Sequence, residues 1–187
     1  MRYKYRTRAF TLGRYPLGEA NASITLLTDE FGVIRARAQG LRRPASKMTV
    51  GLQTLAESDI MLVRGKEGWR LVGTVLRNDW ARTLSRENAA RAGRIADLIR
   101  RLSQGEDAEP RLFTIFTAFV SALADSREEL GEAAETLAAL KALRVLGHDD
   151  GELSLDGQFS AATLASVAKE RTASIARVNA GIYASGL

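Results

Sequence analysis

The chain of 187 residues contains no cysteine and a single histidine. Without cysteine there can be no disulfide bond, no thiolate metal site and no cysteine nucleophile. The one histidine, His148, stands beside Gly147 and the pair Asp149–Asp150, without the further donors at fixed spacing that a metal site needs. We therefore expect neither a bound metal nor another cofactor.

The sequence also lacks the common motifs of catalytic sites. Gly65–Lys66 has neither the following Ser or Thr nor the upstream Gly of a phosphate-binding loop. No G-x-S-x-G or H-E-x-x-H segment occurs. The paired acids fall in turns or at helix starts, where capping explains them. These absences favour a binding protein over an enzyme.

Long apolar runs are missing as well. No segment approaches the roughly 18 apolar residues that a membrane-spanning helix needs. The first ten residues, MRYKYRTRAF, have no apolar core of the kind found in signal peptides. A hydrophobic content of 45% with only three prolines is nevertheless enough to build a core. We expect a folded cytoplasmic protein that does not enter a membrane.

Positive charge is abundant but unevenly distributed. Residues 1–80 hold 14 Lys and Arg against 7 Asp and Glu, whereas residues 81–187 hold 13 against 15. The whole excess of the net charge of +5 therefore lies in the first part of the chain. Such asymmetry indicates a module that binds a polyanion joined to a neutral module.

The first part has the pattern of short β-strands. Alternation and β-forming residues predict strands over 3–12, 23–28, 33–39, 59–64 and 69–76, and Gly65–Gly68 reads as a hairpin loop. The turn cluster Tyr15–Gly18 is expected to separate the first two strands. Five short antiparallel strands suit a small closed barrel, most commonly an OB-fold. We assign residues 1–80 to an OB-fold nucleic-acid-binding domain.

After Trp80 the apolar period becomes helical. The pattern predicts one helix ending at Gln104–Gly105, a second that begins at Pro110, and a third that ends at Gly147. A last helical region begins with a cap at Ser160 and breaks near Arg171. We assign residues 81–187 to a helical domain, so that the predicted fold class is α+β.

Cations gather on the third predicted strand and in the loop after it. Arg35 and Arg37 share one face because side chains alternate along a strand. If strand pairing brings the predicted hairpin alongside, its cations join this surface. The candidate nucleic-acid-binding residues are Arg35, Arg37, Arg42, Arg43, Lys47, Arg64, Lys66, Trp69 and Arg70. The alternative is a solvated strand edge, where Lys and Arg prevent mispairing.

Trp69 is the one aromatic residue within this set, and two interpretations of it stay open. It could be a platform on which a base stacks, an interaction worth roughly 1–3 kcal/mol per base. It could equally close the barrel as a core residue.

Several segments resemble the bacterial RecO family of recombination mediators. The run Arg6–Ala20 is similar to the family's opening segment, which ends in G-E-x. Leu26–Gly32 resembles its L-x-T-x-x-x-G segment, and Gly40–Lys47 its G-x-R-R-x-x-S segment, in the same order and spacing. The tail from Val178 to Leu187 is similar to that of short members. The resemblance is good over residues 1–80 and weaker beyond.

This resemblance implies an N-terminal OB-fold, a C-terminal helical domain and a role in DNA repair. It implies binding of single- and double-stranded DNA, strand annealing, and loading of recombinase onto DNA coated by single-stranded-DNA-binding protein. RecR and the acidic C-terminal tail of that coating protein are the implied partners, in the bacterial cytoplasm at the nucleoid. Two alternatives stay open: an adaptor that docks acidic protein tails, and an OB-fold protein that binds RNA.

One departure from the family concerns zinc. Many members carry a four-cysteine zinc site after the third helix, whereas residues 147–160 contain no cysteine here. Zinc is therefore not expected, and the site that would hold a protein tail cannot be placed by matching residues.

Overall fold

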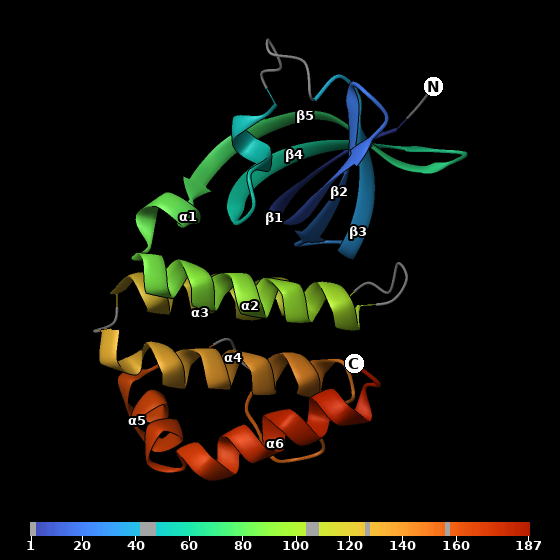
Figure 1. Cartoon of the computed structure of the whole chain (residues 1–187). Helices are drawn as coiled ribbons and strands as arrows, with labels where there is room; N and C mark the ends of the chain where they lie inside the picture. The colour runs from blue at the N-terminus through green and yellow to red at the C-terminus, as the bar shows by residue number, and fades with distance from the viewer. Residues whose placement is uncertain (1–2, 42–47, 104–108, 126–127, 156–157) are drawn as a thin grey trace. The chain divides into compact units, whose positions relative to one another are not determined.

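The computed structural model of the chain describes residues 3–41, 48–103, 109–125, 128–155 and 158–187 (Figure 1). The chain divides into two compact units, one formed mainly by residues 1–83 and the other by residues 84–104 and 111–187. The division falls close to the predicted boundary at residue 80. No helix within the described residues is long and apolar enough to cross a membrane.

The first unit is a closed five-stranded barrel in the order β1-β2-β3-β5-β4. Its strands are β1 (Lys4–Leu17), β2 (Asn21–Thr28), β3 (Gly32–Ala38), β4 (Ala56–Gly65) and β5 (Gly68–Asp79). A short 3₁₀ helix, η1 (Val50–Leu52), precedes β4, and the short helix α1 (Trp80–Thr83) follows β5. The α+β class and the OB-like barrel agree with the expectation from the sequence.

One strand pair corrects the prediction of a wholly antiparallel barrel. β3 and β5 run parallel, with Ala36, Arg37 and Ala38 opposite Trp69, Arg70 and Leu71. The reason is topological: β4 returns beside β1 and runs antiparallel to it. β5 then runs antiparallel to β4, which gives it the direction of β3.

The first strand is longer than predicted. β1 continues past Gly13 and through the expected turn cluster to Leu17. Its register with β2 shifts between Thr11 and Gly13, where an extra residue forms a bulge. Pairing with β2 therefore overrides the breaking tendency of Gly13 and Pro16, and it places Tyr15 opposite Ser23.

Apolar residues on alternate positions of the strands fill the barrel. Small Ala36 and Ala38 face inward on β3, next to Trp69 and Leu71 of β5. Further buried members of this core are Ala9, Ile24, Leu26, Ile34, Ile60 and Leu62. The opposite positions on β3, Arg35 and Arg37, are exposed, as the alternation predicts.

The second unit is a bundle around a central helix. Its elements are α2 (Arg86–Leu102), α3 (Arg111–Asp125), η2 (Glu128–Leu130), α4 (Gly131–Val145), α5 (Ala161–Lys169) and α6 (Arg171–Ala184). α4 is buried on most of its surface because α2, α3, α5 and α6 all pack against it (Figure 1). The cap predicted at Ser160 is present, because the Ser160 hydroxyl accepts a hydrogen bond from the Thr163 N–H. The predicted break between the last two helices lies at Glu170, next to Arg171.

An ion pair connects the last helix, α6, to the segment that follows α4. Arg177 of α6 donates two hydrogen bonds to Asp149, whose side chain is only 5% exposed. Arg144 of α4 donates to the Asp149 carbonyl at 2.9 Å. These hydrogen bonds from Arg177 hold the pKa of the Asp149 carboxyl below its ordinary value.

We expect Asp149→Asn to lower the free energy of unfolding by about 1.5–3 kcal/mol, the range for hydrogen bonds to charged groups. Because the folded pKa of Asp149 is lowered, its contribution is complete above the unfolded value of about 3.9 and is lost as the pH falls through the folded pKa. Denaturant unfolding at pH 7 and near pH 3 measures this. Asp150→Asn is the matched control, since Asp150 is fully exposed, and its effect should stay within about 0.5 kcal/mol.

Candidate nucleic-acid interface

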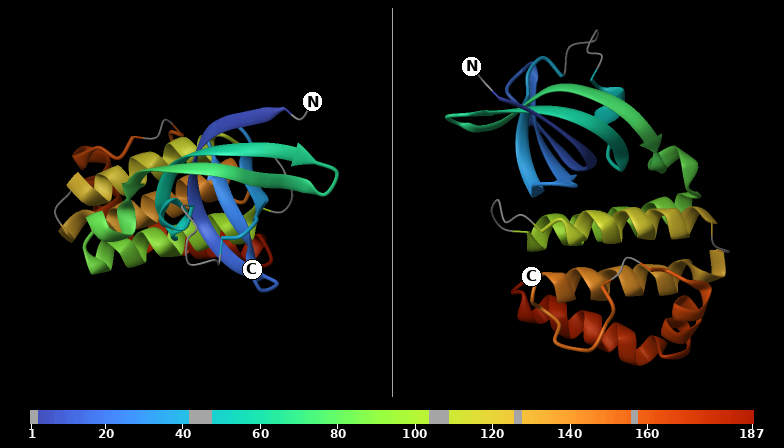
Figure 2. Two further views of the ribbon diagram at one scale, coloured as in Figure 1. Left: turned by 90° about the horizontal axis from the view of Figure 1, so that it is seen from above. Right: turned by 180° about the vertical axis from the view of Figure 1, so that it is seen from behind.

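The parallel pairing of β3 and β5 brings together cations that are far apart in the sequence. Arg37 of β3 lies opposite Arg70 of β5. The β4–β5 hairpin continues beyond this pair and extends away from the body of the barrel (Figures 1 and 2). Its tip carries Lys66 and Glu67, which are both exposed. The condition set by the sequence prediction, that strand pairing should join the two basic segments, is met.

A row of four side chains crosses the outer face of the barrel here. The registers pair Tyr15 with Ser23, Ser23 with Arg37, and Arg37 with Arg70. Paired residues point to the same face of a sheet, so all four lie on the face opposite the core residues Ile24 and Ala36. At about 4.8 Å per strand, the row is about 14 Å long. We refer to these four residues as the basic row.

Arg35 extends the basic row along β3. It lies two residues before Arg37 and therefore on the same face, and it is exposed. Neither Arg35 nor Arg70 forms an ion pair with an acid of the described residues. In OB-folds, the face of the second and third strands and the loop between the fourth and fifth are the surfaces that bind oligonucleotides. The basic row lies on that face.

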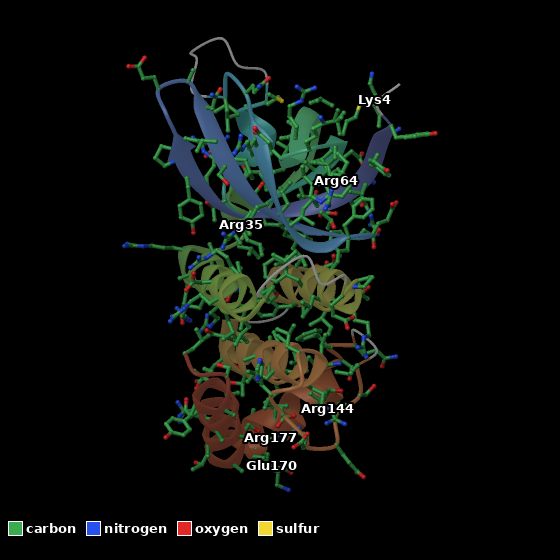
Figure 3. All side chains as sticks on the ribbon, turned by 90° about the vertical axis from the view of Figure 1, so that its right-hand side faces the viewer. Lys4, Arg35, Arg64, Arg144, Glu170 and Arg177 are labelled. Atoms are coloured by element: carbon green, nitrogen blue, oxygen red, sulfur yellow. The ribbon has the colours of Figure 1, made fainter. Side chains whose placement is uncertain are left out.

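Trp69 lies on the opposite, inner face and is only 7% exposed. Its ring packs edge-on with Tyr5 at 5.3 Å and at a tilt with Phe31 at 5.1 Å between centroids. The Arg64 guanidinium lies over the ring, 4.7 Å from its centroid. This geometry favours the interpretation of Trp69 as a core residue. It also shows that the Arg64 guanidinium packs against the Trp69 ring. Figure 3 labels Arg35 and Arg64, which project from different strands.

Tyr15 is the exposed aromatic residue of the basic row. Its side chain is 45% exposed, and two strand spacings separate it from Arg37. Sequence reasoning missed it because Tyr15–Pro16–Leu17–Gly18 read as a turn. The alternation of Tyr15 with Leu17 is compatible with a strand. It predicts the exposed face of Tyr15 only when the bulge between Thr11 and Gly13 is taken into account.

A cavity of about 340 Å³ lies where the hairpin leaves the barrel. Its lining includes Arg37, Lys66, Glu67, Trp69 and Arg70. Arg37 Nη1 donates to Glu67 Oε2 at 2.6 Å, and both side chains of this pair remain more than half exposed. Two buried donors, Arg70 Nε and Trp69 Nε1, have no hydrogen-bond partner among the described residues.

The remaining predicted cations do not all join this surface. Arg42, Arg43 and Lys47 lie outside the described residues. On β1, Arg8 donates to Asp29 at 2.8 Å, and Arg6 lies 3.9 Å from Asp59. On β1, Arg8 is therefore paired with an acid that lies far from it in the sequence.

Within the described residues, no group of three or more His, Asp or Glu side chains is arranged to hold a metal ion. The expectation that the chain needs no zinc stays a prediction from its composition.

Comparison with known proteins finds a family model that is similar to the barrel. Residues 1–74 match the family model "Recombination protein O N terminal". Among curated proteins, the DNA repair protein RecO of Heliobacterium modesticaldum is 33% identical over 118 residues, which cover 59% of this chain and 42% of that protein. The chain thus aligns with less than half of the length of this relative.

The two aromatic residues lead to a prediction that separates stacking from packing. We expect Tyr15→Ala to weaken binding of a single-stranded oligonucleotide by about 1–3 kcal/mol with little loss of stability, because Tyr15 is exposed. Trp69→Phe should lower stability but preserve affinity, since Trp69 is a core residue. Fluorescence anisotropy and thermal unfolding measure the two effects. The opposite pattern would make Trp69 the stacking residue.

Proposed function

We propose that this chain, whose barrel matches the N-terminal family model of recombination protein O, is a DNA-binding recombination mediator that acts in DNA repair without catalysing a reaction itself. It binds single- and double-stranded DNA, anneals complementary strands and helps to load recombinase onto coated single strands. RecR and the single-stranded-DNA-binding protein are its partners in the cytoplasm. The observation that carries this proposal is the basic row, in which Arg37 and Arg70 lie side by side on the outer face of the barrel.

The charge of the barrel supports annealing as well as binding. Two complementary strands repel each other through their phosphates, and a cationic surface that covers those phosphates lowers the repulsion. Annealing requires contacts to the sugar-phosphate backbone, and such contacts do not depend on the base sequence. Arg35, Arg37 and Arg70 can supply such contacts, while Tyr15 offers a ring that any base can stack on.

We expect the double variant Arg37→Ala, Arg70→Ala to weaken binding of a single-stranded DNA oligonucleotide and to slow annealing. If each arginine contacts one phosphate, the slope of log K against log salt should become shallower by about 1.4, at about 0.7 per phosphate for single strands. Anisotropy titrations at several salt concentrations measure the slope, and mixing of labelled complementary strands measures annealing.

Arg77→Ala is the control for this experiment, because Arg77 lies on the same strand but is bound to Asp59 at 3.1 Å. Its slope should match that of the unmodified protein. An unchanged slope in the double variant would refute the proposal. An RNA oligonucleotide of equal length tests the alternative of RNA binding, since tighter binding of RNA would reflect contacts to the 2′-hydroxyl.

A second candidate function rests on a groove in the helical unit. A cavity of about 450 Å³ lies between α2, α4 and α6, and its apolar lining comes mainly from Ile95, Leu98, Ile175, Val178 and Ile182. The charged residues of the lining are Arg94, Arg101, Asp97 and Glu135. Arg94 is bound to Glu135 by two hydrogen bonds, at 2.6 and 2.7 Å, which raise the pKa of its guanidinium. Arg101 is exposed and is the cation we assign to an incoming acid.

We propose that this groove takes an acidic protein tail that ends in an apolar residue, such as that of the single-stranded-DNA-binding protein. Leu98→Glu should then abolish binding of a peptide of that composition, because it puts a carboxylate among apolar side chains opposite an acidic ligand. DNA affinity should not change, since the groove and the basic row share no residue. Anisotropy with a labelled peptide, with and without oligonucleotide, measures both. Competition between peptide and DNA would place the tail on the barrel instead.

A further inference from the structure

The cavity at the base of the β4–β5 hairpin has the composition of a binding site for an oxyanion. Three cations, Arg37, Lys66 and Arg70, contribute to its lining, against a single acid, Glu67. Lys66 and Arg70 form no ion pair with any described residue. Positive charge in a concave place attracts an anion more strongly than the same charge on a flat surface, because low-dielectric walls focus the field.

Two residues that line the cavity each have a buried donor without a hydrogen-bond partner among the described residues. Arg70 Nε and Trp69 Nε1 are shielded from solvent, and neither has an acceptor among the described residues. Buried donors are ordinarily paired, so two unpaired donors on adjacent lining residues call for an explanation. An anion with several acceptor oxygens would accept from the guanidinium of Arg70 on the outer face, whereas the indole of Trp69 lies with the core on the inner face.

Glu67 is the acid that Arg37 binds. Its carboxylate lies 2.6 Å from Arg37 Nη1, and the side chains of Glu67 and Arg37 are 78% and 55% exposed. Exposed ion pairs contribute little to stability, so an incoming anion can displace the carboxylate at small cost. Glu67 sits at the tip of a hairpin that extends from the barrel (Figure 2), so its side chain has solvent to move into.

We propose that this cavity is an anchoring site for one backbone phosphate of a nucleic-acid strand, and that Glu67 is its built-in competitor. The phosphate takes the place of the Glu67 carboxylate on Arg37 and accepts from Arg70. The inference rests on the proposed function, because Arg37 and Arg70 belong both to the cavity and to the basic row. A strand that lies along the basic row therefore reaches the cavity without a break. This continuity favours a nucleic-acid phosphate over a carboxylate from an acidic peptide.

Tryptophan fluorescence provides a direct readout. The chain has two tryptophans, and Trp80→Phe leaves Trp69, which lines the cavity, as the only tryptophan, so that excitation selective for indole reports on it alone. In this background, a single-stranded DNA oligonucleotide should change the emission of Trp69. Glu67→Gln should lower the midpoint of that titration about two- to fivefold, as expected for the loss of a weak exposed pair. Glu152→Gln removes the same charge from an exposed position of the helical unit and should leave the midpoint unchanged.

Further ligands distinguish the sources of an anion. Inorganic phosphate should produce the same emission change at much higher concentration, and Arg70→Gln should abolish it. A larger response to an acidic peptide than to the oligonucleotide would overturn the proposal in favour of a peptide site.

Two outcomes separate this inference from the proposed function. If anisotropy shows that the oligonucleotide binds while Trp69 emission does not change, or if Glu67→Gln and Glu152→Gln behave alike, the phosphate site is wrong and DNA binding stands. If the oligonucleotide does not bind at all, DNA binding fails. In that case the titration with inorganic phosphate alone tests the anion site. If inorganic phosphate does not change the emission of Trp69, the anion site is refuted as well.

Discussion

The parallel pairing of β3 with β5 is the constraint on which the rest of the barrel depends. It closes the barrel, and its register decides which side chains face outward. With Ala36 opposite Trp69, the indole finds room beside small residues in the core, and Arg37 and Arg70 point together to the outer face. If β5 slipped by one residue relative to β3, every side chain of β5 would move to the opposite face of the sheet. The guanidinium of Arg70 would then be buried and the indole of Trp69 exposed. The cost of burying that charge fixes the register.

Periodicity in the sequence predicted most of the elements, and its failures have local causes. The helical stripes and the cap at Ser160 were readable because they depend on neighbours three or four residues away. The end of β1 was not readable, since Gly13 and Pro16 are breakers whose effect is overridden by pairing with a different strand. That error hid Tyr15. For Trp69 the alternation with Leu71 was visible, but alternation alone does not say which face of a barrel strand is the core.

The sequence shows which residue types make up the candidate site, but it does not show which of their charges are neutralised by an acid. A count of charges over residues 1–80 describes a strongly basic module, but it does not show which cations meet an acid. Asp29 binds Arg8, Glu67 binds Arg37, and Asp59 binds Arg77, each across a distance in sequence that no local pattern reveals. Among the described residues, strand register brings Arg35, Lys66 and Arg70, which have no acid partner, together around the β3–β5 pair. That concentration arises from strand register, not from composition.

Exposure explains why similar ion pairs have different consequences in the two units. In the helical unit, the side chain of Asp149 is almost fully buried, so that breaking its pair with Arg177 leaves a largely dehydrated carboxylate without its main partner. On the barrel, Arg37 and Glu67 are both largely in solvent, so that separating them costs little and water solvates each. The first arrangement is suited to holding a helix in place, and the second to exchanging one anion for another. A surface that must bind and release a polyanion needs pairs of the second kind, because cations locked into buried pairs could not be shared with a phosphate.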